Sequence, residues 1–501
     1  MREWDELSEL ELEEVLADSL PEMLPEGVAQ EVTPWRTAMD RVLIGMALNA
    51  ITLNFLYLNY ILPFVGSVMC LLGWRALRRE NRWFTFCWLA SIYKMGSLIF
   101  DLALKATVYS NALPAPVHYT LGIIGWVFFV GQIIALWQGM RAVRKKAGLE
   151  PGCASGFMLL VWYGLIVLLA IAGYSGLFLG IPLVVGYILI IRALYKLSQE
   201  LDEAGYAIRT ASVRIEDSWM KRGITLITLL GILCGYLFFS GYRMDWHEVD
   251  IIQSQDVDVI TEELLALGFP AYVLDDLTDE DILACDGAIR LTSWSTLNHI
   301  TDDHLYPGQT QYDIYELEIT GVAVELPGER ETWKFFHHFR FVEDVTFFGT
   351  ESILLWPAYS IYEGWAALGV ESDWSGDGIA TGQVLYDKYG VTYAAPYHAI
   401  TSGGVNTFDI ALDFSFPNRG EKQRGYASYV CQEVNDGYIM NSWINYVHQR
   451  GWWQYPAVTD VYTKRGYSFF GNYSVFMEVQ DALQFTIHED ELDLWADDIG
   501  E

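Results

Sequence analysis

The feature that most constrains the fold of this 501-residue chain is a series of seven apolar stretches in its first half. We predict that each stretch forms a membrane-spanning helix. The stretches cover residues 42–58, 60–77, 84–108, 119–140, 156–173, 176–191 and 223–242. A straight helix crosses a hydrocarbon core of ~30 Å with about 20 residues, so several of these stretches are short and their boundaries are approximate.

The loops between the apolar stretches predict which side of the membrane each part occupies. The loops after the second, fourth and sixth stretches are rich in Lys and Arg, whereas the connections around 58–60, 109–118 and 174–175 contain none. The basic residues are Arg75, Arg78, Arg79 and Arg82, then Arg141, Arg144, Lys145 and Lys146, then Arg192, Lys196, Arg209, Arg214, Lys221 and Arg222. Short basic loops stay in the cytoplasm. We therefore expect a multi-pass protein of the cell membrane, in contact with the lipid bilayer, with a cytoplasmic N-terminus and with everything beyond residue 243 outside.

Charge is segregated along the chain. Residues 244–501 contain 11 Lys and Arg against 44 Asp and Glu, so their formal charge of −33 equals that of the whole chain. Such a domain repels nucleic acid and other polyanions and attracts divalent cations and basic peptides. Nucleic acid is therefore excluded as a partner of the outer domain. The simpler interpretation is that the acidic surface only keeps the domain soluble.

These patterns divide the chain into five regions. They are an acidic cytoplasmic tail with an amphipathic helix and a Pro linker (1–41), a seven-span membrane domain (42–243), an extracytoplasmic helical segment (244–288), an extracytoplasmic β-rich domain (289–486) and an acidic C-terminal tail (487–501). Within the cytoplasmic segment 193–222, apolar residues at helical spacing predict an extension of the sixth helix. Any inward signal needs a separate cytoplasmic partner, because the cytoplasmic portions are too short for an effector domain.

The outer region combines two short helices with a β domain. We predict a helix over 257–267 that ends at Gly268, and a second helix with Thr278 as its N-cap. Aromatic and β-branched runs then predict strands at 312–324, 332–341, 383–393, 407–416, 426–434 and 467–479. The alternation of Phe408, Ile410, Leu412, Phe414 and Phe416 places these side chains on one strand face. This pattern of short aromatic and β-branched strands indicates an antiparallel β-sandwich or jelly roll.

Three ionisable residues mark the third apolar stretch. Lys94, Asp101 and Lys105 fall near one helical face. Ionisable groups at membrane depth pair with each other, line a water-filled path or belong to a functional site. A transporter or channel subunit that uses Lys94 and Asp101 is one interpretation; neutralisation of Asp101 by Lys105, with Lys94 held by a polar neighbour such as Gln132, is the other.

A calcium-loop pattern occurs in the outer domain. Asp373, Ser375 and Asp377 alternate before Gly378, as the first ligands of a calcium loop do. Val384 occupies the position at which a bidentate Glu would complete the EF-hand, so the full pattern fails. We consider calcium as the only candidate cofactor, beside the simpler interpretation of a polar turn.

Two further groups of residues are candidates for special roles. Trp452, Trp453 and Tyr455 form an aromatic cluster that stacks on a sugar if it is exposed, although such residues more often fill a core or lie at the lipid interface. Cys285 and Cys431 are the two cysteines of the outer region, and they form a disulfide only if the compartment is oxidising. Two thiols are the alternative.

No enzyme signature supports a specific reaction. The zinc-protease, zinc-ribbon and nucleophile-elbow motifs are missing from the sequence. His337 and His338 are adjacent, so in a strand they point to opposite faces and do not share a metal. We predict a non-enzymatic cell-surface protein whose outer domain binds a cation, a basic peptide or an envelope component and relays occupancy to a cytoplasmic partner. An outer-face hydrolase is a further alternative.

Overall fold

The fold is taken from a computed structural model of the chain. It describes residues 35–51, 53–110, 114–173, 177–208, 215–249, 255–301, 313–356, 365–367, 380–402, 409–433, 439–469, 475–487 and 492–494. The chain divides into two units. The helical unit comprises Met1–Leu104 and Leu113–Ile232, and the β unit comprises Lys105–Ala112 and Leu233–Glu501. The predicted amphipathic helix of the N-terminal tail lies outside the described residues.

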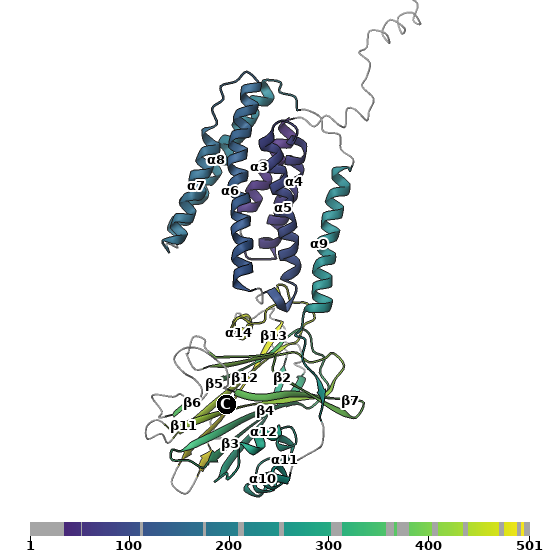
Figure 1. Ribbon diagram of the computed structural model, residues 1–501, viewed down its shortest axis with the longest axis vertical. Helices are drawn as coiled ribbons and strands as arrows, with labels where there is room; N and C mark the ends of the chain where they lie inside the picture. Colours follow the sequence, from purple (N-terminus) through teal and green to yellow (C-terminus); the bar gives the residue numbers. More distant parts are fainter. Residues whose placement is uncertain are drawn as a thin grey trace, which may run out of the picture. The chain divides into compact units, whose positions relative to one another are not determined.

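Long helices make up the first half of the chain (Figure 1). They are α3 (Trp35–Ala50), α4 (Leu58–Leu77), α5 (Arg82–Leu104), α6 (Ala115–Lys146), α7 (Ala154–Ile171), α8 (Leu177–Glu203) and α9 (Asp217–Phe239), with a 3₁₀ turn η1 at Val108–Ser110. By length and apolar composition, six of the described helices, α4 to α9, could cross a membrane. The extension of the sixth predicted helix into the segment from residue 193 is confirmed, because α8 continues to Glu203.

The first predicted span differs from the structure. We expected a helix over 42–58, but α3 covers Trp35–Ala50 and has only 16 residues. The helix begins earlier because Trp35 is buried, with its indole nitrogen donating to Ser198 of α8 at 3.1 Å. α3 packs tightly against α4: a Cβ added to Gly45 would lie 2.5 Å from the carbonyl oxygen of Gly66. Small residues at such a contact allow two helix backbones to approach closely.

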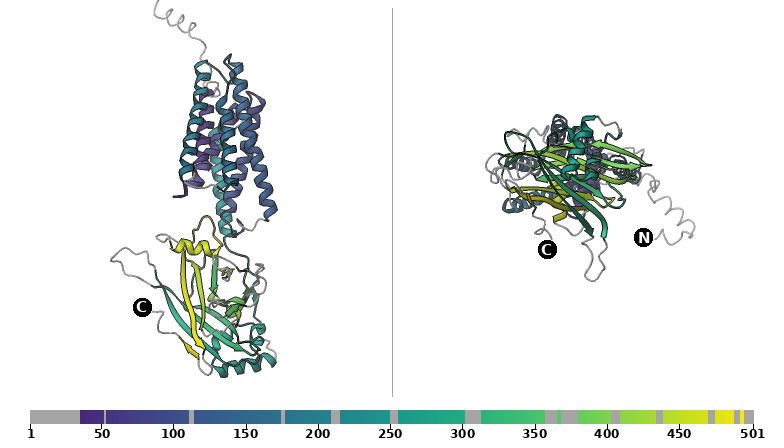
Figure 2. Two further views of the ribbon diagram at one scale, coloured as in Figure 1. Left: turned by 90° about the vertical axis from the view of Figure 1, so that its left-hand side faces the viewer. Right: turned by 90° about the horizontal axis from the view of Figure 1, so that it is seen from below.

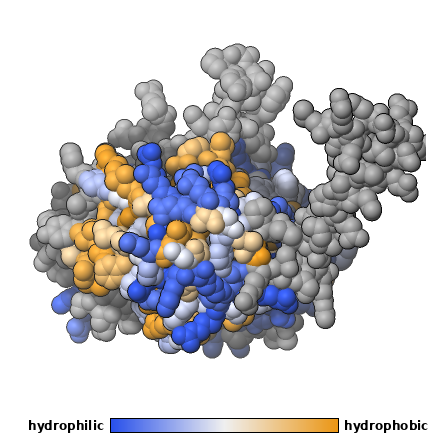
Figure 3. All heavy atoms as spheres, turned by 90° about the horizontal axis from the view of Figure 1, so that it is seen from above, coloured by the Kyte–Doolittle hydropathy of each residue, from blue (hydrophilic) through white to orange (hydrophobic). Residues whose placement is uncertain are grey.

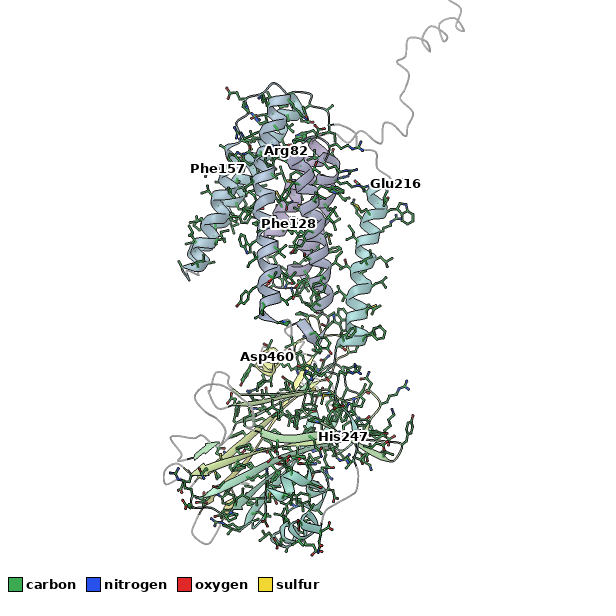
Figure 4. The ribbon with its side chains drawn as sticks, viewed as in Figure 1. Arg82, Phe128, Phe157, Glu216, His247 and Asp460 are labelled. Atoms are coloured by element: carbon green, nitrogen blue, oxygen red, sulfur yellow. The ribbon has the colours of Figure 1, made fainter. Side chains whose placement is uncertain are left out.

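The three basic loops of the helical unit contact one another. Lys146, the last residue of α6, forms an ion pair of 3.7 Å with Glu80, between α4 and α5. Arg144 pairs with Glu200 of α8 at 2.6 Å. Arg75 contacts Asp217, the first residue of α9, at 3.3 Å. These loops therefore lie at one end of the helical unit, where Figure 4 labels Arg82 and Glu216 and where Figure 3 shows hydrophilic residues surrounded by apolar ones.

The β unit contains two antiparallel sheets. The first has the order β1-β8-β7-β11-β4-β3-β2, with β6 also paired to β11, and the second has the order β14-β13-β12-β5-β10-β9. The strands are β1 (His247–Glu248), β2 (Leu291–Thr301), β3 (Asp313–Leu326), β4 (Thr332–Phe341), β5 (Glu351–Trp356), β6 (Trp365–Ala367), β7 (Ala380–Lys388), β8 (Val391–Pro396), β9 (Ala399–Ser402), β10 (Ile410–Phe414), β11 (Glu421–Glu433), β12 (Ile439–Gln449), β13 (Phe476–Ile487) and β14 (Leu492–Leu494).

Aromatic side chains fill the space between the two sheets. Phe339 of the first sheet lies 5.9 Å from Phe414 of the second, measured between ring centroids, and Phe335 lies 6.4 Å from Phe485. Ile410, Leu412, Phe414 and Phe416 are all buried in this core, which confirms the predicted strand face for the three residues of β10. Phe416 follows the strand, and Phe408 lies outside the described part. The two sheets therefore form a sandwich, whose layers can be followed in Figure 2.

Three short helices cover the other face of the first sheet. They are α10 (Gln255–Leu267), α11 (Ala271–Leu274) and α12 (Asp279–Leu283). Their buried residues, among them Ile260 and Val273, pack with Phe336 and Tyr426 of the sheet. The predicted N-cap is confirmed, since the Thr278 hydroxyl accepts a hydrogen bond from the Asp281 amide. α11 was not predicted; it positions residues of the site described below.

Several predicted strands differ from the observed elements. The run 383–393 belongs to a hairpin rather than to one strand, because the chain turns at Tyr389 and Gly390, both of which have positive φ. The run 467–479 begins in α14 (Val461–Phe469) and ends in β13, whose described residues start at Phe476. We did not predict β2, β5 or β12. β12 contains the polar residues Asn441, Ser442 and Asn445, which weaken the apolar alternation on which the prediction depended.

Candidate functional site: a basic pocket in the β unit

A polar pocket of about 490 Å³ lies in the β unit, where α11 meets the ends of three strands. Tyr272, Asp275 and Asp276 come from α11 and the residues that follow it. β4 contributes His338 and Arg340; β7 contributes Asp387; β11 contributes Lys422 and Arg424. Three of the few cations of this acidic region therefore converge on one concave surface.

Strand register places two arginines side by side. Arg340 of β4 and Arg424 of β11 are direct partners in the antiparallel pair. Like charges at such positions repel each other unless counterions are close. Glu318, the partner of Arg340 on β3, accepts a hydrogen bond from the Arg340 Nε. The Arg340 guanidinium also lies over the Tyr272 ring, 4.3 Å from its centroid, which fixes its plane.

Two carboxylates hold Arg424 inside the pocket. Its Nε donates to Asp276 at 2.7 Å and its Nη1 donates to Asp387 at 3.0 Å. Burial alone would lower the pKa of Arg424, but these carboxylates outweigh burial and raise it. The same guanidinium lowers the pKa of Asp387 against the opposing effect of burial. Arg424 is therefore a fixed, charged donor.

His338 completes the polar wall of the pocket. Its Nε2 lies 2.9 Å from Asp276 Oδ2, and its side chain is buried. Its Nδ1 has no hydrogen-bond partner among the described residues. A buried nitrogen without a partner is destabilising unless water or a ligand satisfies it. His337 points to the opposite face, toward Ser442 in the core, as predicted.

The cations at the mouth of the pocket are accessible. The Arg340 side chain is 40% exposed and that of Lys422 is 76% exposed. Asp276 and Asp387 are already engaged with Arg424, whereas Asp275 is exposed. The pocket therefore offers cationic donors for an anionic group and one carboxylate for a hydroxyl or ammonium group beside it.

The predicted calcium ligands are not among the residues that the structure describes. Asp373, Ser375 and Asp377 fall outside the described residues. Within the described part of the chain, no group of three or more His, Cys, Asp and Glu side chains could hold a metal ion. Calcium binding therefore stays a prediction.

The predicted aromatic cluster is formed. The Trp452 and Trp453 rings lie 5.7 Å apart, and Trp453 stacks with Tyr455 at 6.3 Å. Both tryptophans also contact Tyr236, near the end of α9. The cluster is consequently partly covered, with Trp452 61% exposed and Trp453 39% exposed.

The polar residues of α5 occupy different settings. The Lys94 Nζ donates to Asn49 Oδ1 of α3 at 2.8 Å, beside a cavity of about 50 Å³ that Gln132 also lines. Asp101 lies two turns further along the helix. Lys105 lies beyond the end of α5, where its carbonyl oxygen accepts a hydrogen bond from the Ala457 amide at 2.7 Å. The partner Asn49 was not predicted, because the sequence does not show which helices are neighbours.

Cys285 and Cys431 are separate buried thiols in the structure. Cys285 lies in the core beneath α10 to α12, and its Sγ donates to the Asp281 carbonyl at 3.5 Å. Cys431 lies in the core between the two sheets. The two side chains thus belong to different hydrophobic clusters, and a bridge would require one of them to leave its own.

A Ser–Lys pair in the β unit resembles the nucleophile and base of a hydrolase, but it is buried and closed to a substrate. The Lys464 Nζ donates to Ser352 Oγ at 2.6 Å, and burial lowers the pKa of Lys464 to about 8. Ser352 in turn donates to Asp413. Ser352 and Lys464 are both fully buried. A nucleophile needs a path to its substrate, so we interpret this network as part of the core.

Comparison with known proteins identifies no family. No protein-family model matches the sequence, and no curated protein is significantly similar to it. Among solved structures, a pore-forming protein is 8% identical, with 41% of this chain and 95% of that chain covered and a TM-score of 0.20. The collagen-binding subdomain of the Enterococcus faecalis surface protein ACE is 12% identical (32% and 90% covered, TM-score 0.20), and Clostridium perfringens delta-toxin is 6% identical (41% and 93% covered, TM-score 0.20). TM-scores of this size carry no argument about this chain.

Proposed function

We propose that this chain is a multi-pass membrane protein whose β unit lies outside the cytoplasm and binds a small polar ligand with an anionic group in the pocket of Arg340, Lys422 and Arg424. The ligand belongs to the class of envelope components. Two sets of observations support this proposal: the apolar surface of the helices, and the accessible cations at the mouth of the pocket.

The exposed surface of the helices fits lipid rather than water. Leu168 is 66% exposed, Ile171 79%, Leu229 59% and Phe238 73%. Soluble monomers rarely expose large contiguous apolar patches. The apolar side chains on α6 to α9 would instead contact acyl chains.

The arrangement of the helix ends supports the predicted orientation. The basic loops meet at one end of the helical unit, and α3 begins at that end, with Arg41 bound to Asp217 at 2.8 Å. Basic loops are retained in the cytoplasm. In this proposal α3 crosses the membrane together with the six candidate spans α4 to α9, and these seven crossings take the chain to the outside.

The pocket favours an anionic group over a free cation. Its exposed charges are Arg340, Lys422 and Asp275; its other two carboxylates are engaged with Arg424, and Asp387 also pairs with Lys422 at 3.1 Å. Charge-assisted hydrogen bonds from Arg to carboxylate or phosphate are the strong kind. The acidity of the surrounding domain disfavours polyanions, so we propose a small ligand with one anionic group, with Asp275 accepting from its hydroxyl or ammonium groups.

A matched pair of sugars tests this proposal. The full chain in lipid nanodiscs is titrated with glucose 6-phosphate and with glucose, and binding is followed by saturation-transfer NMR. We expect binding of the phosphorylated sugar only. The double variant Arg340→Gln/Lys422→Gln should weaken binding by about tenfold or more, the equivalent of ~1.4 kcal/mol.

A variant outside the pocket provides the control. Lys388→Gln also removes a cation from the β unit, but Lys388 lies near the β7–β8 turn and does not line the pocket. It should bind the phosphorylated sugar like the unmodified chain. Equal binding of both sugars, or equal loss in the double variant and Lys388→Gln, would overturn the proposed site.

A further inference from the structure

The aromatic cluster of the β unit lies beside the end of a membrane-type helix. Tyr236 is in the last turn of α9, one of the helices able to span a membrane. The Trp453 ring centroid is 5.6 Å from that of Tyr236, and the Trp452 centroid is 6.1 Å away. Both tryptophans come from the loop 450–458, more than two hundred residues later in the sequence.

The same loop also contacts the segment that follows α5. The Ala457 amide donates to the carbonyl oxygen of Lys105, the residue after the end of α5, at 2.7 Å. In the 3₁₀ turn that follows, the Tyr109 ring lies 6.3 Å from Phe239, the last residue of α9. The loop is therefore fixed against the last turn of α9 and against the segment that follows α5, all within the β unit.

These contacts determine the depth of the two tryptophans if the helices span a bilayer. The end of a spanning helix lies at the boundary between acyl chains and headgroups. One helical turn rises ~5.4 Å, so a ring that packs against Tyr236 lies within about one turn of that boundary. Trp and Tyr are enriched at this depth, because their rings are apolar and their polar edges reach water.

We propose that loop 450–458 is an interfacial anchor, whose Trp452 and Trp453 rings lie among the lipid headgroups of the outer leaflet. This inference rests on the membrane placement proposed above. The exposed part of Trp452, 61% of its surface, is then covered by lipid rather than by a sugar. Anchoring holds the β unit at the membrane surface beyond the covalent link through α9.

Depth-dependent quenching tests the anchor. Single cysteines replace Trp452, Tyr389 or Leu229 in a Cys234→Ser background, because Cys234 is the exposed native cysteine and the other five are buried. Each is labelled with the environment-sensitive dye NBD in the full chain, reconstituted in phosphatidylcholine vesicles that contain headgroup or acyl-chain nitroxide lipids. Tyr389, 90% exposed at the β7–β8 turn, is the matched aromatic control, and Leu229 is the control within α9.

Labels at the three positions test the proposed anchor and the proposed membrane placement separately. We expect several-fold stronger headgroup quenching at 452 than at 389, and strong acyl-chain quenching at 229. If 452 behaves like 389 while 229 is quenched, the anchor is wrong and the membrane placement stands. If 229 is not quenched, both fail.

A second variant guards against misfolding of the cysteine variant. Trp452→Phe/Trp453→Phe keeps an aromatic ring at both positions. In the unmodified chain, brominated lipids should quench part of the intrinsic tryptophan fluorescence, and the variant should lose part of this quenched fraction. An unchanged quenched fraction would contradict the anchor. Addition of soluble glucose, which should leave the quenching unchanged, tests the sugar-stacking alternative; displacement from lipid by the sugar would favour that alternative.

Discussion

Arg340 and Arg424 are direct partners across the β4–β11 pair, although both are cations. The arrangement is tolerated because Glu318 neutralises Arg340, while Asp276 and Asp387 neutralise Arg424. Asp276 binds both Arg424 and His338, and Asp387 binds both Arg424 and Lys422. Of these two carboxylates, Asp276 is the buried one.

Asp276→Asn should destabilise the β unit strongly. The substitution removes the carboxylate that His338 faces and one of the two carboxylates bound to Arg424, and removal of one member of a buried ion pair costs about 3–5 kcal/mol. Chemical unfolding of the full chain in detergent, followed by the fluorescence of the β unit, measures the change. Glu329→Gln, in an exposed turn, is the charge-matched control and should have little effect. Equal stability of the two variants would show that the network is not required.

His337→Gln should flatten the acid dependence of stability. Burial lowers the pKa of His337 from 6.5 to about 3. Because the folded-state pKa is depressed, the stabilisation is present above the unfolded-state pKa and is lost as pH falls from 6.5 toward 3. The loss amounts to about 1.4 kcal/mol for each pH unit in that window. Unfolding at a series of pH values should show a shallower slope for the variant; an unchanged slope would contradict the assignment.

Asp409→Asn should increase the stability of the folded state at neutral pH. Burial raises the pKa of Asp409 from 3.8 to about 6, despite the hydrogen bond from Tyr462. Because this folded-state pKa is raised, the stabilisation is present below pH 3.8 and is lost as pH rises through 6. Removing the charge should therefore raise stability above pH 6 by roughly 3 kcal/mol and change little at pH 3.5. Lower stability of the variant at neutral pH would show that the ionised carboxylate is favourable.

Gly45→Ala should loosen the contact between α3 and α4. The added methyl would lie 2.5 Å from the Gly66 carbonyl oxygen and 2.7 Å from Cys70 Sγ. Overpacking of this kind costs about 1–3 kcal/mol. Gly164→Ala in α7, where a Cβ would meet nothing within 4 Å, is the matched control and should be neutral. Thermal unfolding in nanodiscs compares the two; equal midpoints would argue against a close approach.

Sequence patterns predicted the helices and part of the sandwich for a physical reason. Apolar runs and strand alternation are local, so α4 and β4 are close to their predicted ranges. Burial of adjacent His337 and His338 on opposite faces follows from strand geometry alone. α3 was misplaced because its first residues are polar and its burial depends on neighbours such as Ser198.

The candidate pocket could not be predicted in the same way. Asp276, Arg340 and Arg424 are far apart in the sequence and meet only through the pairing of β4 with β11 and the packing of α11. Among 44 acids and 11 basic residues of the outer region, no local spacing marks these three. The aromatic cluster was found from the sequence because Trp452, Trp453 and Tyr455 are neighbours along the chain.

The membrane orientation of the β unit is the central claim, and cysteine labelling in intact cells tests it most directly. Tyr389→Cys and Ser218→Cys are each made in the Cys234→Ser background; both native side chains are exposed, one in the β unit and the other at the start of α9. A membrane-impermeant maleimide should label residue 389 in intact cells and residue 218 only after permeabilisation. Labelling of 218 but not of 389 in intact cells would contradict the account.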